Sequence, residues 1–430
     1  MPIDRSDDLD DPLLGPWLKG FPPAAEPLRR SQLARQGWCL RDGALPFPVA
    51  TLRASALAHN VAWMHRFAAE RGLDLAPHGK TSMSPQLFRR QLDAGAWGIT
   101  FATVFQLRLG VKAGVRRALI ANQVQSAADL AGLARLMAVH AGLRVVFLVD
   151  SVEQLRQIEA WRATQRQAPT FEVLLELGVP GGRTGVRGHD DALALARALR
   201  ASPVLRLVGL ECYEGLAVSG DDATDTAYAD ALMTRLQALA DAIDAEGLFE
   251  ADELIVSAGG SAIFDLVAAR LRPKLSRPVR GILRSGCYVT HDHGHYQRLV
   301  HRVAPRCGCA DDLQGALEVW AMVQSAPEPG LVLLSAGRRD LSFDVEMPHA
   351  LALVRDGRRH ALPRDGSWRI KGLNDQHAHL RVDAASALQP RVGDLIVLGI
   401  SHPCTTFDKW SWMPLVDDDD RVVDAVTVHF

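Results

Sequence analysis

Short apolar runs alternate with longer amphipathic segments through most of the chain. Eight of the runs have the length and aliphatic character of buried strands, at residues 73–77, 98–102, 118–121, 143–149, 171–177, 205–212, 254–257 and 281–283. The segments between them are mostly long enough for a helix, as at 85–94, 127–140, 152–166, 190–201 and 224–246. Alternating strands and helices predict parallel βαβ units, and eight such units predict a (β/α)8 TIM barrel. An open doubly wound sheet is the alternative, although no glycine-rich dinucleotide fingerprint follows the first strand.

Beyond residue 300 the pattern changes to short, partly alternating runs. They lie at 316–324, 331–334, 351–355, 379–382 and 394–398, with turn signals such as Asp356-Gly357 between them. This spacing predicts an antiparallel β domain. Four aspartates, 417–420, predict a solvated turn before a last strand-like run. The proline-dotted start predicts an arm with one helix near 28–36. The expected division is therefore an arm at 1–46, packed on the β domain, a barrel at 47–298 and the β domain at 299–430.

Composition and charge exclude several classes of partner. The chain is 48% hydrophobic and 23% charged, which describes a globular protein. A formal net charge of −2 gives no reason to expect nucleic acid or a membrane surface as partner. No apolar run is long enough for a transmembrane helix, and the acidic N-terminus does not resemble a signal peptide. Six scattered cysteines indicate a reduced, cytoplasmic protein rather than a disulfide framework.

Lys80 stands just beyond the first predicted strand, in the sequence PHGKT. Only six of the 48 basic residues are lysines, so a lysine at the end of a buried strand is unusual in this chain. An unprotonated lysine amine condenses with aldehydes, which makes Lys80 a candidate for a Schiff base with pyridoxal phosphate. A solvated loop lysine is the alternative.

Glycine and polar residues follow the other predicted strands, where a TIM barrel has its active site. The sequence SAGGS (257–261) follows the seventh strand and Ser285-Gly286-Cys287 the eighth, so the backbone N–H groups of both loops are candidates for binding a phosphate. Ordinary βα turns are the alternative. Arg183, in PGGRTG, is a candidate partner of a pyridine nitrogen, with a phosphate contact or a plain surface arginine as the alternatives. Tyr213 is a candidate cofactor contact, with packing as its alternative.

A second cluster of candidate residues, HPCTTFD, follows the apolar run 394–398. His402 and Cys404 stand at i and i+2, which places them on the same side of an extended segment. Imidazole and thiolate suit Zn²⁺, and two protein ligands would leave positions open for catalysis. A buried cysteine beside a turn histidine is the alternative. His377 and His379 are further candidates near that site, and the alternating histidines 291, 293 and 295 rank below His402 and Cys404.

These residues together resemble a known family. The stretches VATLRASALAHNVAWM, APHGKTSMSPQLFRRQLDAGAWGITFAT and ANQ, between residues 49 and 123, are similar to the N-terminal barrel of alanine racemase-like, fold type III pyridoxal phosphate enzymes. Within them the chain resembles the branch of D-serine dehydratase, D-threonine aldolase and bacterial D-amino acid deaminases. SAGGS and RSGCYV resemble the phosphate loops of that branch, and HPCTTFD resembles its metal motif. The similarity spans residues 47 to 410.

The resemblance implies a role for each candidate. Lys80 would form the Schiff base and remove the α-proton. Backbone N–H groups of Gly259, Gly260, Gly286 and Cys287 would bind the phosphate, and Tyr213 would touch the cofactor. His402 and Cys404 would hold Zn²⁺, or Mn²⁺. His377 is a candidate substrate contact, but NDQH departs here from the acidic pair that the resemblance leads us to expect before it.

In this branch the aldolases tend to carry aspartate at the position of Cys404, whereas the dehydratases carry cysteine and use zinc. The expected activity is therefore a D-serine/D-threonine dehydratase, an ammonia-lyase that converts a D-β-hydroxy amino acid to a 2-oxo acid and ammonia, working as a homodimer. The alternatives are a D-threonine aldolase, a racemase, or a non-enzymatic carrier of pyridoxal phosphate. Such carriers lack the C-terminal β domain.

Overall fold

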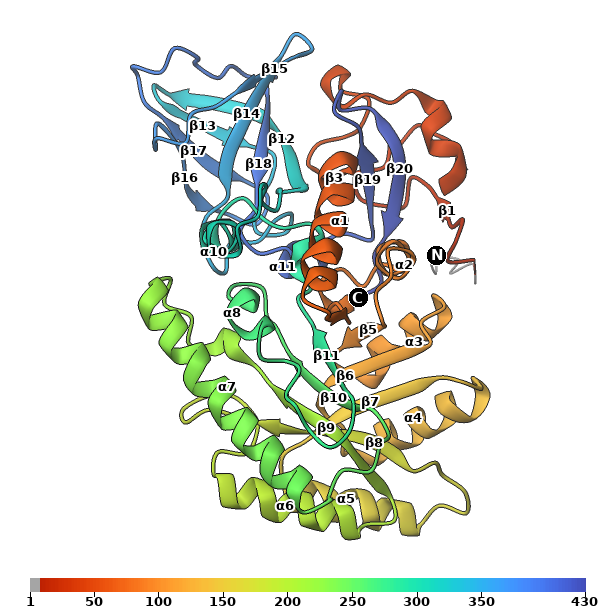
Figure 1. Ribbon diagram of the computed structural model, residues 1–430. Helices are drawn as coiled ribbons and strands as arrows, with labels where there is room; N and C mark the ends of the chain where they lie inside the picture. The colour runs from red at the N-terminus through yellow and green to blue at the C-terminus, as the bar shows by residue number, and fades with distance from the viewer. Residues whose placement is uncertain (1–7) are drawn as a thin grey trace. The chain divides into compact units, whose positions relative to one another are not determined.

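The structure is a computed structural model that describes residues 8–430, so the first seven residues of the predicted arm lie outside it. The chain forms two compact units. The barrel unit comprises Met64–Lys80 and Phe88–Gly286. The β unit comprises the described residues up to Trp63 together with Thr81–Leu87 and Cys287–Phe430. Figure 1 labels the strands and helices of both units.

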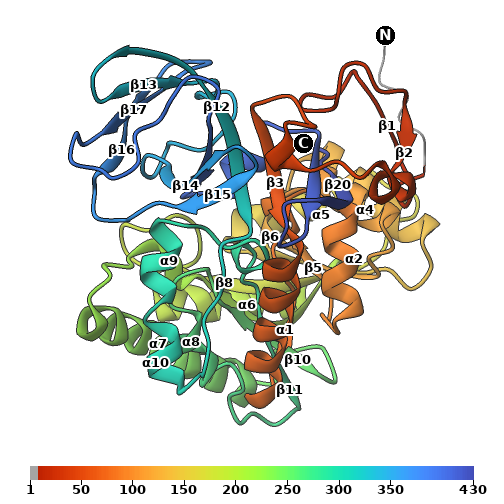
Figure 2. The same cartoon turned by 90° about the horizontal axis from the view of Figure 1, so that it is seen from above.

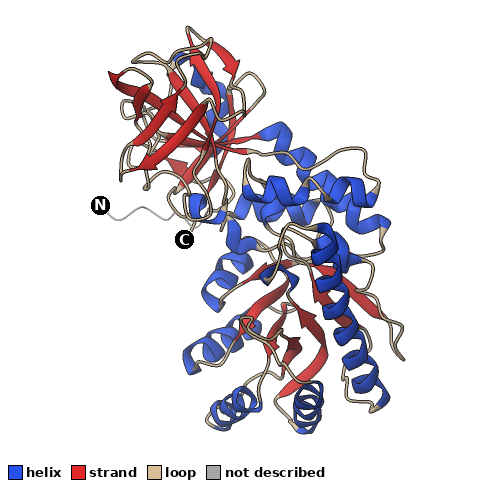
Figure 3. Ribbon diagram, turned by 90° about the vertical axis from the view of Figure 1, so that its left-hand side faces the viewer, coloured by secondary structure: helices blue, strands red, loops and turns tan. Residues whose placement is uncertain are grey.

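All eight predicted barrel strands are present and pair in parallel. Along the sheet they follow the order β4, β11, β10, β9, β8, β7, β6, β5. Their bounds are β4 (Asp74–Leu75), β5 (Ile99–Phe101), β6 (Arg117–Gln123), β7 (Arg144–Val149), β8 (Phe171–Leu177), β9 (Leu205–Cys212), β10 (Leu254–Ala258) and β11 (Val279–Leu283). The ring closes between its two end strands, where the Thr100 N–H donates to the Pro77 carbonyl at 2.8 Å. The predicted (β/α)8 barrel is confirmed, and Figure 3 shows its strands within a layer of helices.

Helices begin after the barrel strands at residues that can cap them. Ser126 Oγ accepts a hydrogen bond from the Asp129 N–H at 3.1 Å, and Thr103 and Ser151 cap α3 and α5 in the same way. Such caps satisfy backbone donors that have no partner within the helix. The helices between β3 and the last barrel strand along the chain are α1 (Ala54–Glu70), α2 (Pro85–Asp93), α3 (Val104–Lys112), α4 (Ala127–Val139), α5 (Val152–Ala163), α6 (His189–Ala201), α7 (Asp222–Ala245) and α8 (Phe264–Ala268).

The β unit is built on a ten-stranded sheet, and Figure 2 labels several of its strands. Neighbouring strands follow the order β13, β17, β16, β14, β18, β12, β3, β19, β20, with β15 beside β14. All pairings are antiparallel except that of β3 with β19. The bounds are β3 (Val49–Arg53), β12 (Leu317–Glu328), β13 (Leu331–Leu334), β14 (His349–Arg355), β15 (Arg358–Ala361), β16 (Trp368–Leu373), β17 (Ala378–Val382), β18 (Leu395–Gly399), β19 (Trp412–Val416) and β20 (Val422–Thr427).

Strand β3 lies in a different unit from the one expected. We placed the start of the barrel at residue 47, yet β3 pairs with β12 and β19 in the sheet of the β unit. The sequence could not decide between the two sheets, because Val49 to Leu52 are all buried and such a run suits the interior of either one. The chain therefore enters the barrel unit later than expected, at Met64, and returns to the β unit earlier than expected, at Cys287 rather than at residue 299. It also returns to the β unit over Thr81–Leu87.

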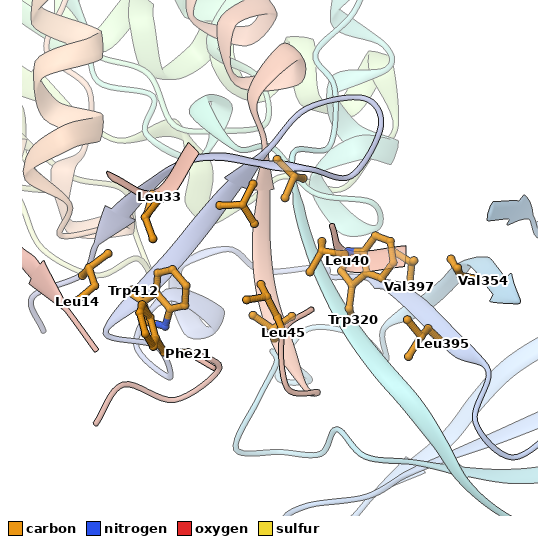
Figure 4. Packing of buried hydrophobic residues seen from close by; sticks show 14 of the residues in the cluster. Leu14, Phe21, Leu33, Leu40, Leu45, Trp320, Val354, Leu395, Val397 and Trp412 are labelled. Atoms are coloured by element: carbon orange, nitrogen blue, oxygen red, sulfur yellow. The ribbon is translucent and has the colours of Figure 1, made fainter. Parts of the chain in front are cut away.

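The described part of the N-terminal arm contributes to the core of the β unit. Phe21 packs edge-on against Trp38, with ring centroids 5.5 Å apart, and lies 5.3 Å from the Trp412 ring. Leu33 and Leu40 are fully buried in the same cluster (Figure 4). The predicted helix at 28–36 is a 3-10 helix, η1 (Arg30–Gln36), preceded by the short strand β2 (Leu28–Arg29).

The acidic run at 417–420 is only partly a solvated turn. Asp418 and Asp419 are exposed, but Asp420 is fully buried. Its carboxylate accepts hydrogen bonds from Arg41 at 2.6 Å and Arg53 at 2.9 Å. A buried carboxylate requires such partners, so the prediction was wrong for this residue.

Two expectations from composition hold for the described residues. The six cysteines, all among the described residues, form no disulfide with one another. Among residues 8–430, none of the helices has the length and apolar character needed to cross a bilayer.

Candidate active site

Lys80 lies at the C-terminal end of the first barrel strand, in the 3-10 turn η3 (Gly79–Thr81). Its side chain is exposed. The preceding Gly79 is closely enclosed, because a Cβ there would come within 2.7 Å of Ile99 and 2.8 Å of Phe88. This glycine lets the chain pass against the barrel wall directly before the lysine. The position agrees with the one predicted for a Schiff-base lysine.

A buried ion pair stands at the C-terminal ends of β9 and β11. The Arg284 guanidinium donates to a Glu211 carboxylate oxygen and, at 3.0 Å, to the Cys212 carbonyl. Burial raises the pKa of Glu211 to about 7, although Arg284 acts in the opposite direction. Arg284 is the most enclosed cation at this end of the barrel, whereas Arg183 is exposed. Arg284 was not among the predicted site residues, and only its place directly before the loop at 285–287 could have indicated a role in the site.

Three buried polar atoms at this end of the barrel have no hydrogen-bond partner among the described residues. They are His78 Nδ1, Glu211 Oε2 and Arg284 Nε. Burial lowers the pKa of His78 well below its usual value, and the nearby cations Arg284, Lys80 and Arg183 lower it further, so this imidazole is neutral. A buried region that contains both hydrogen-bond donors and acceptors without partners fits a polar ligand that carries acceptors and donors of its own.

The loop after β10 holds a carboxylate where a phosphate was predicted. Glu214 is fully buried, and its carboxylate accepts hydrogen bonds from the N–H of Gly259, at 3.0 Å, and of Gly260. Ser285 Oγ donates to the Gly260 carbonyl at 2.5 Å and ties this loop to the one after β11. The backbone N–H groups of Gly259 and Gly260 therefore bind a carboxylate of the chain itself, and a phosphate would need Glu214 to move or would use other donors of the two loops.

The remaining barrel candidates lie at the same strand ends. The Arg183 guanidinium stands 5.2 Å from the centre of the Tyr213 ring, a cation–π arrangement. A Cβ on Gly286 would come within 2.6 Å of the His78 Cβ, so the loop after β11 runs against the end of β4. The structure thus brings Lys80, Arg183, Tyr213, Gly259, Gly260 and Gly286 to one end of the barrel.

His402 and Cys404 lie after β18 in the β unit, with Cys404 at the start of α11 (Cys404–Phe407). The His402 Nδ1 lies 2.5 Å from an Asp344 carboxylate oxygen, and Thr405 Oγ1 donates to the other oxygen at 2.8 Å. A carboxylate on Nδ1 fixes the tautomer and orientation of a metal-binding histidine. Asp344 was missed by the sequence analysis, since it lies 58 residues away.

The thiol of Cys404 lies among polar partners. The Cys287 thiol, the His402 ring and the Thr81 hydroxyl hold the pKa of Cys404 well below its usual value. The Cys404 thiolate and Asp344 in turn raise the pKa of His402 to about 9. The Sγ atoms of Cys404 and Cys287 are 3.9 Å apart, and Thr81 Oγ1 lies 3.6 Å from Cys404 Sγ.

The other histidines do not join this pair. His377 is exposed in the turn between β16 and β17, and His379 Nε2 bonds to Asn374 in the same hairpin. His293 is buried against Gly315 and Gly399, and burial lowers its pKa to about 4. Across residues 8–430, no three His, Cys, Asp or Glu side chains are arranged as they stand to hold a metal ion.

Both groups that the resemblance implies are chemically compatible with these residues. Pyridoxal phosphate fits an accessible lysine, an anion-binding loop and unpartnered buried polar atoms, with Glu214 as the residue that has to give way. A divalent metal of zinc type fits an imidazole whose Nδ1 is held by a carboxylate beside a cysteine of lowered pKa.

Comparison with known proteins agrees with this architecture. Residues 52–278 match the family described as "Alanine racemase, N-terminal domain", and residues 316–416 match the one described as "Putative serine dehydratase domain". A D-threonine aldolase from Arthrobacter sp. is 27% identical over 371 residues, which cover 86% of this chain and 89% of the relative. A D-threo-3-hydroxyaspartate dehydratase from Delftia sp. (strain HT23) is 28% identical over 389 residues, which cover 84% and 92%.

Among solved structures, that of a D-threonine aldolase from Filomicrobium marinum has a TM-score of 0.75 at 25% identity. The match covers 91% of this chain and 96% of that one. The order of barrel and antiparallel β domain is thus shared over nearly the full length. The chain belongs to the alanine racemase-like family, in the branch whose members include aldolases and dehydratases of D-hydroxy amino acids.

Proposed function

We propose that the protein is a pyridoxal phosphate-dependent ammonia-lyase that converts a D-β-hydroxy amino acid to a 2-oxo acid and ammonia. Membership of the alanine racemase-like family implies the cofactor. Relatives named as dehydratase and aldolase of D-hydroxy amino acids support the substrate class. The observation that carries the choice of elimination is the cysteine at position 404, beside His402, because the resemblance implies aspartate at this position in the aldolases of the branch.

The chain's own groups have separate tasks in this reaction. Lys80 Nζ binds the cofactor and, as a free amine, accepts the α-proton of the substrate. His78 stays neutral, so its ring can accept or donate a hydrogen bond beside Lys80 without adding charge. Arg284, held by Glu211, keeps a fixed positive charge at the end of the barrel.

Two bound groups would supply the remaining chemistry. Pyridoxal phosphate supplies an aldehyde and an electron sink for the α-carbanion, and a divalent metal held by His402 and Cys404 supplies a Lewis acid for the β-hydroxyl. Asp344 keeps the His402 ring oriented for that metal through Nδ1.

A product assay tests the proposal. Purified holoenzyme is given D-serine, D-threonine or D-3-hydroxyaspartate, and 2-oxo acid, ammonia, glycine and aldehyde are quantified with and without a chelator. We expect equal amounts of 2-oxo acid and ammonia, no glycine, and a large loss of rate with chelator that added Zn²⁺ reverses. Glycine and an aldehyde in equal amounts would show a retro-aldolase instead, the activity that the Arthrobacter relative's name describes.

A further inference from the structure

Cys287 stands beside the predicted metal pair, although it was singled out only for its backbone. It begins the 3-10 turn η5 (Cys287–Val289) in the β unit and is buried, with 6% of its surface exposed. Its Sγ lies 3.9 Å from that of Cys404, and Thr81 Oγ1 lies 3.9 Å from Cys287 and 3.6 Å from Cys404. All of these residues belong to the β unit.

The separation of the two sulfur atoms fits a shared metal better than a disulfide. Two thiolates bound to one tetrahedral zinc at about 2.3 Å lie about 3.8 Å apart. A disulfide needs the sulfur atoms at about 2.05 Å. The observed 3.9 Å is close to the first distance and nearly twice the second.

The number of protein ligands at a catalytic zinc also favours a role for Cys287. Catalytic zinc sites have three protein ligands and one open position, whereas His402 and Cys404 provide two. Asp344 holds the Nδ1 of His402, which leaves the Nε2 for a metal. Cys287 is the next thiol in contact with this pair. Among residues 8–430 no three such side chains are arranged as they stand to hold a metal, so binding at this site requires a side-chain rotation within the group.

We propose that Cys287 is the third protein ligand of the metal that His402 and Cys404 bind, which makes the site a Cys2His centre with one open position. The inference rests on the metal role in the proposed function. In this proposal the Cys287 side chain binds the metal, while its backbone N–H is the predicted donor to the phosphate.

Zinc K-edge X-ray absorption of the holoenzyme tests this proposal, because Zn–S distances near 2.3 Å separate from Zn–N and Zn–O distances near 2.0–2.1 Å. The protein is kept in a non-thiol reductant and given one equivalent of Zn²⁺. We expect two sulfur ligands in the wild type, one in Cys287→Ser and one in Cys404→Ser. Cys309→Ser is the control and should keep two, since the thiols of Cys287 and Cys404 contact each other and Thr81.

Metal affinity gives a second readout, by competition with a chromophoric chelator. Loss of a residue that only orients a ligand lowers metal affinity about 10–100-fold, so loss of Cys287 as a ligand should exceed about 100-fold. Circular dichroism verifies that Cys287→Ser is folded, and Cys287→Ala replaces it if it is not.

The outcomes separate the two proposals. One sulfur ligand in both the wild type and Cys287→Ser overturns the assignment of Cys287 and leaves the His402/Cys404 site standing. Wild-type holoenzyme that retains no zinc, or binds it without sulfur, overturns both the assignment and the metal role in the proposed function. An unchanged zinc affinity in Cys287→Ser also overturns the assignment.

Discussion

Lys80 is the residue on which the proposed chemistry depends, and its exposed amine at a barrel strand end is suited to an aldehyde. Lys80→Ala should abolish the visible imine absorption and lower activity at least about 10³-fold, because both the covalent link and the proton acceptor are lost. Borohydride reduction of the wild type should fix the cofactor to the peptide that contains Lys80. Lys371→Ala, an exposed lysine of β16, is the matched control and should behave as wild type. Persistent imine absorption in Lys80→Ala would contradict the assignment.

Asp344 is the residue that should tune the predicted metal site without touching the metal. Asp344→Asn keeps the size of the side chain but weakens the bond to His402 Nδ1, which now measures 2.5 Å. We expect metal affinity to fall about 10–100-fold, measured by chelator competition. The control is Asp375→Asn, at an exposed carboxylate in the hairpin turn between β16 and β17. Equal metal affinity in Asp344→Asn and wild type would show that Asp344 does not orient His402 for the metal.

Residues that act alone at a strand end could be predicted, and residues that act through a partner could not. Lys80 is marked by its rarity, and His402 and Cys404 by their spacing. Glu214 has no such signal, because its role depends on the backbone N–H groups of Gly259 and Gly260, 45 and 46 residues later. These pairings depend on how the barrel closes, which local sequence does not contain.

At the scale of elements, the arm is part of the core of the β unit rather than an addition to it. Phe21→Ala removes a 2% exposed ring that contacts Trp38 and Trp412, so we expect unfolding to become easier by about 3–5 kcal/mol. Urea denaturation of the full chain measures the change. Trp17→Ala is the control, because Trp17 is 50% exposed and should cost far less. A small effect of Phe21→Ala would show that the arm detaches before the sheet unfolds.

Elements with strong periodicity were predicted well, and the exceptions have physical causes. The barrel strands are continuous buried runs between clear helices. Strand β16 was not predicted, because its pairing with β17 has an irregularity next to Gly372, and glycine weakens a strand pattern. Strand β19 contains Pro414, which argues against a strand that pairs on both sides. Strand β3 was predicted as a strand, but its partner strands could not be, since a run that is buried on both faces suits either sheet.

At the scale of the whole molecule, buried neutral histidines should limit stability in acid. Burial lowers the pKa of His293 to about 4 and that of His291 to about 3. Below pH 6.5 the unfolded chain therefore binds protons that the native chain does not, so stability is complete above pH 6.5 and falls as the pH drops toward 4. For His293 alone the change is about 3 kcal/mol.

Urea denaturation between pH 7 and pH 4.5 checks this expectation. His293→Gln should be less stable than wild type at pH 7 but should lose less stability on acidification. His301→Gln is the control, because the His301 side chain is 81% exposed and should leave the slope unchanged. A slope in His293→Gln as steep as in wild type would assign the acid sensitivity to other groups.

The position of β3 in the sheet sets the order in which the two units can fold during synthesis on the ribosome. This strand is made early, yet its neighbours in the sheet are β12 and β19, which end at residues 328 and 416. The barrel strands are complete once residue 283 has emerged, so the barrel can close on the nascent chain while Val49–Arg53 still lacks both edges. During that interval an apolar strand with unpaired backbone is open to chaperones and to aggregation. Limited proteolysis of stalled chains should find the barrel protected, and residues 8–53 cleavable, until β19 has been made.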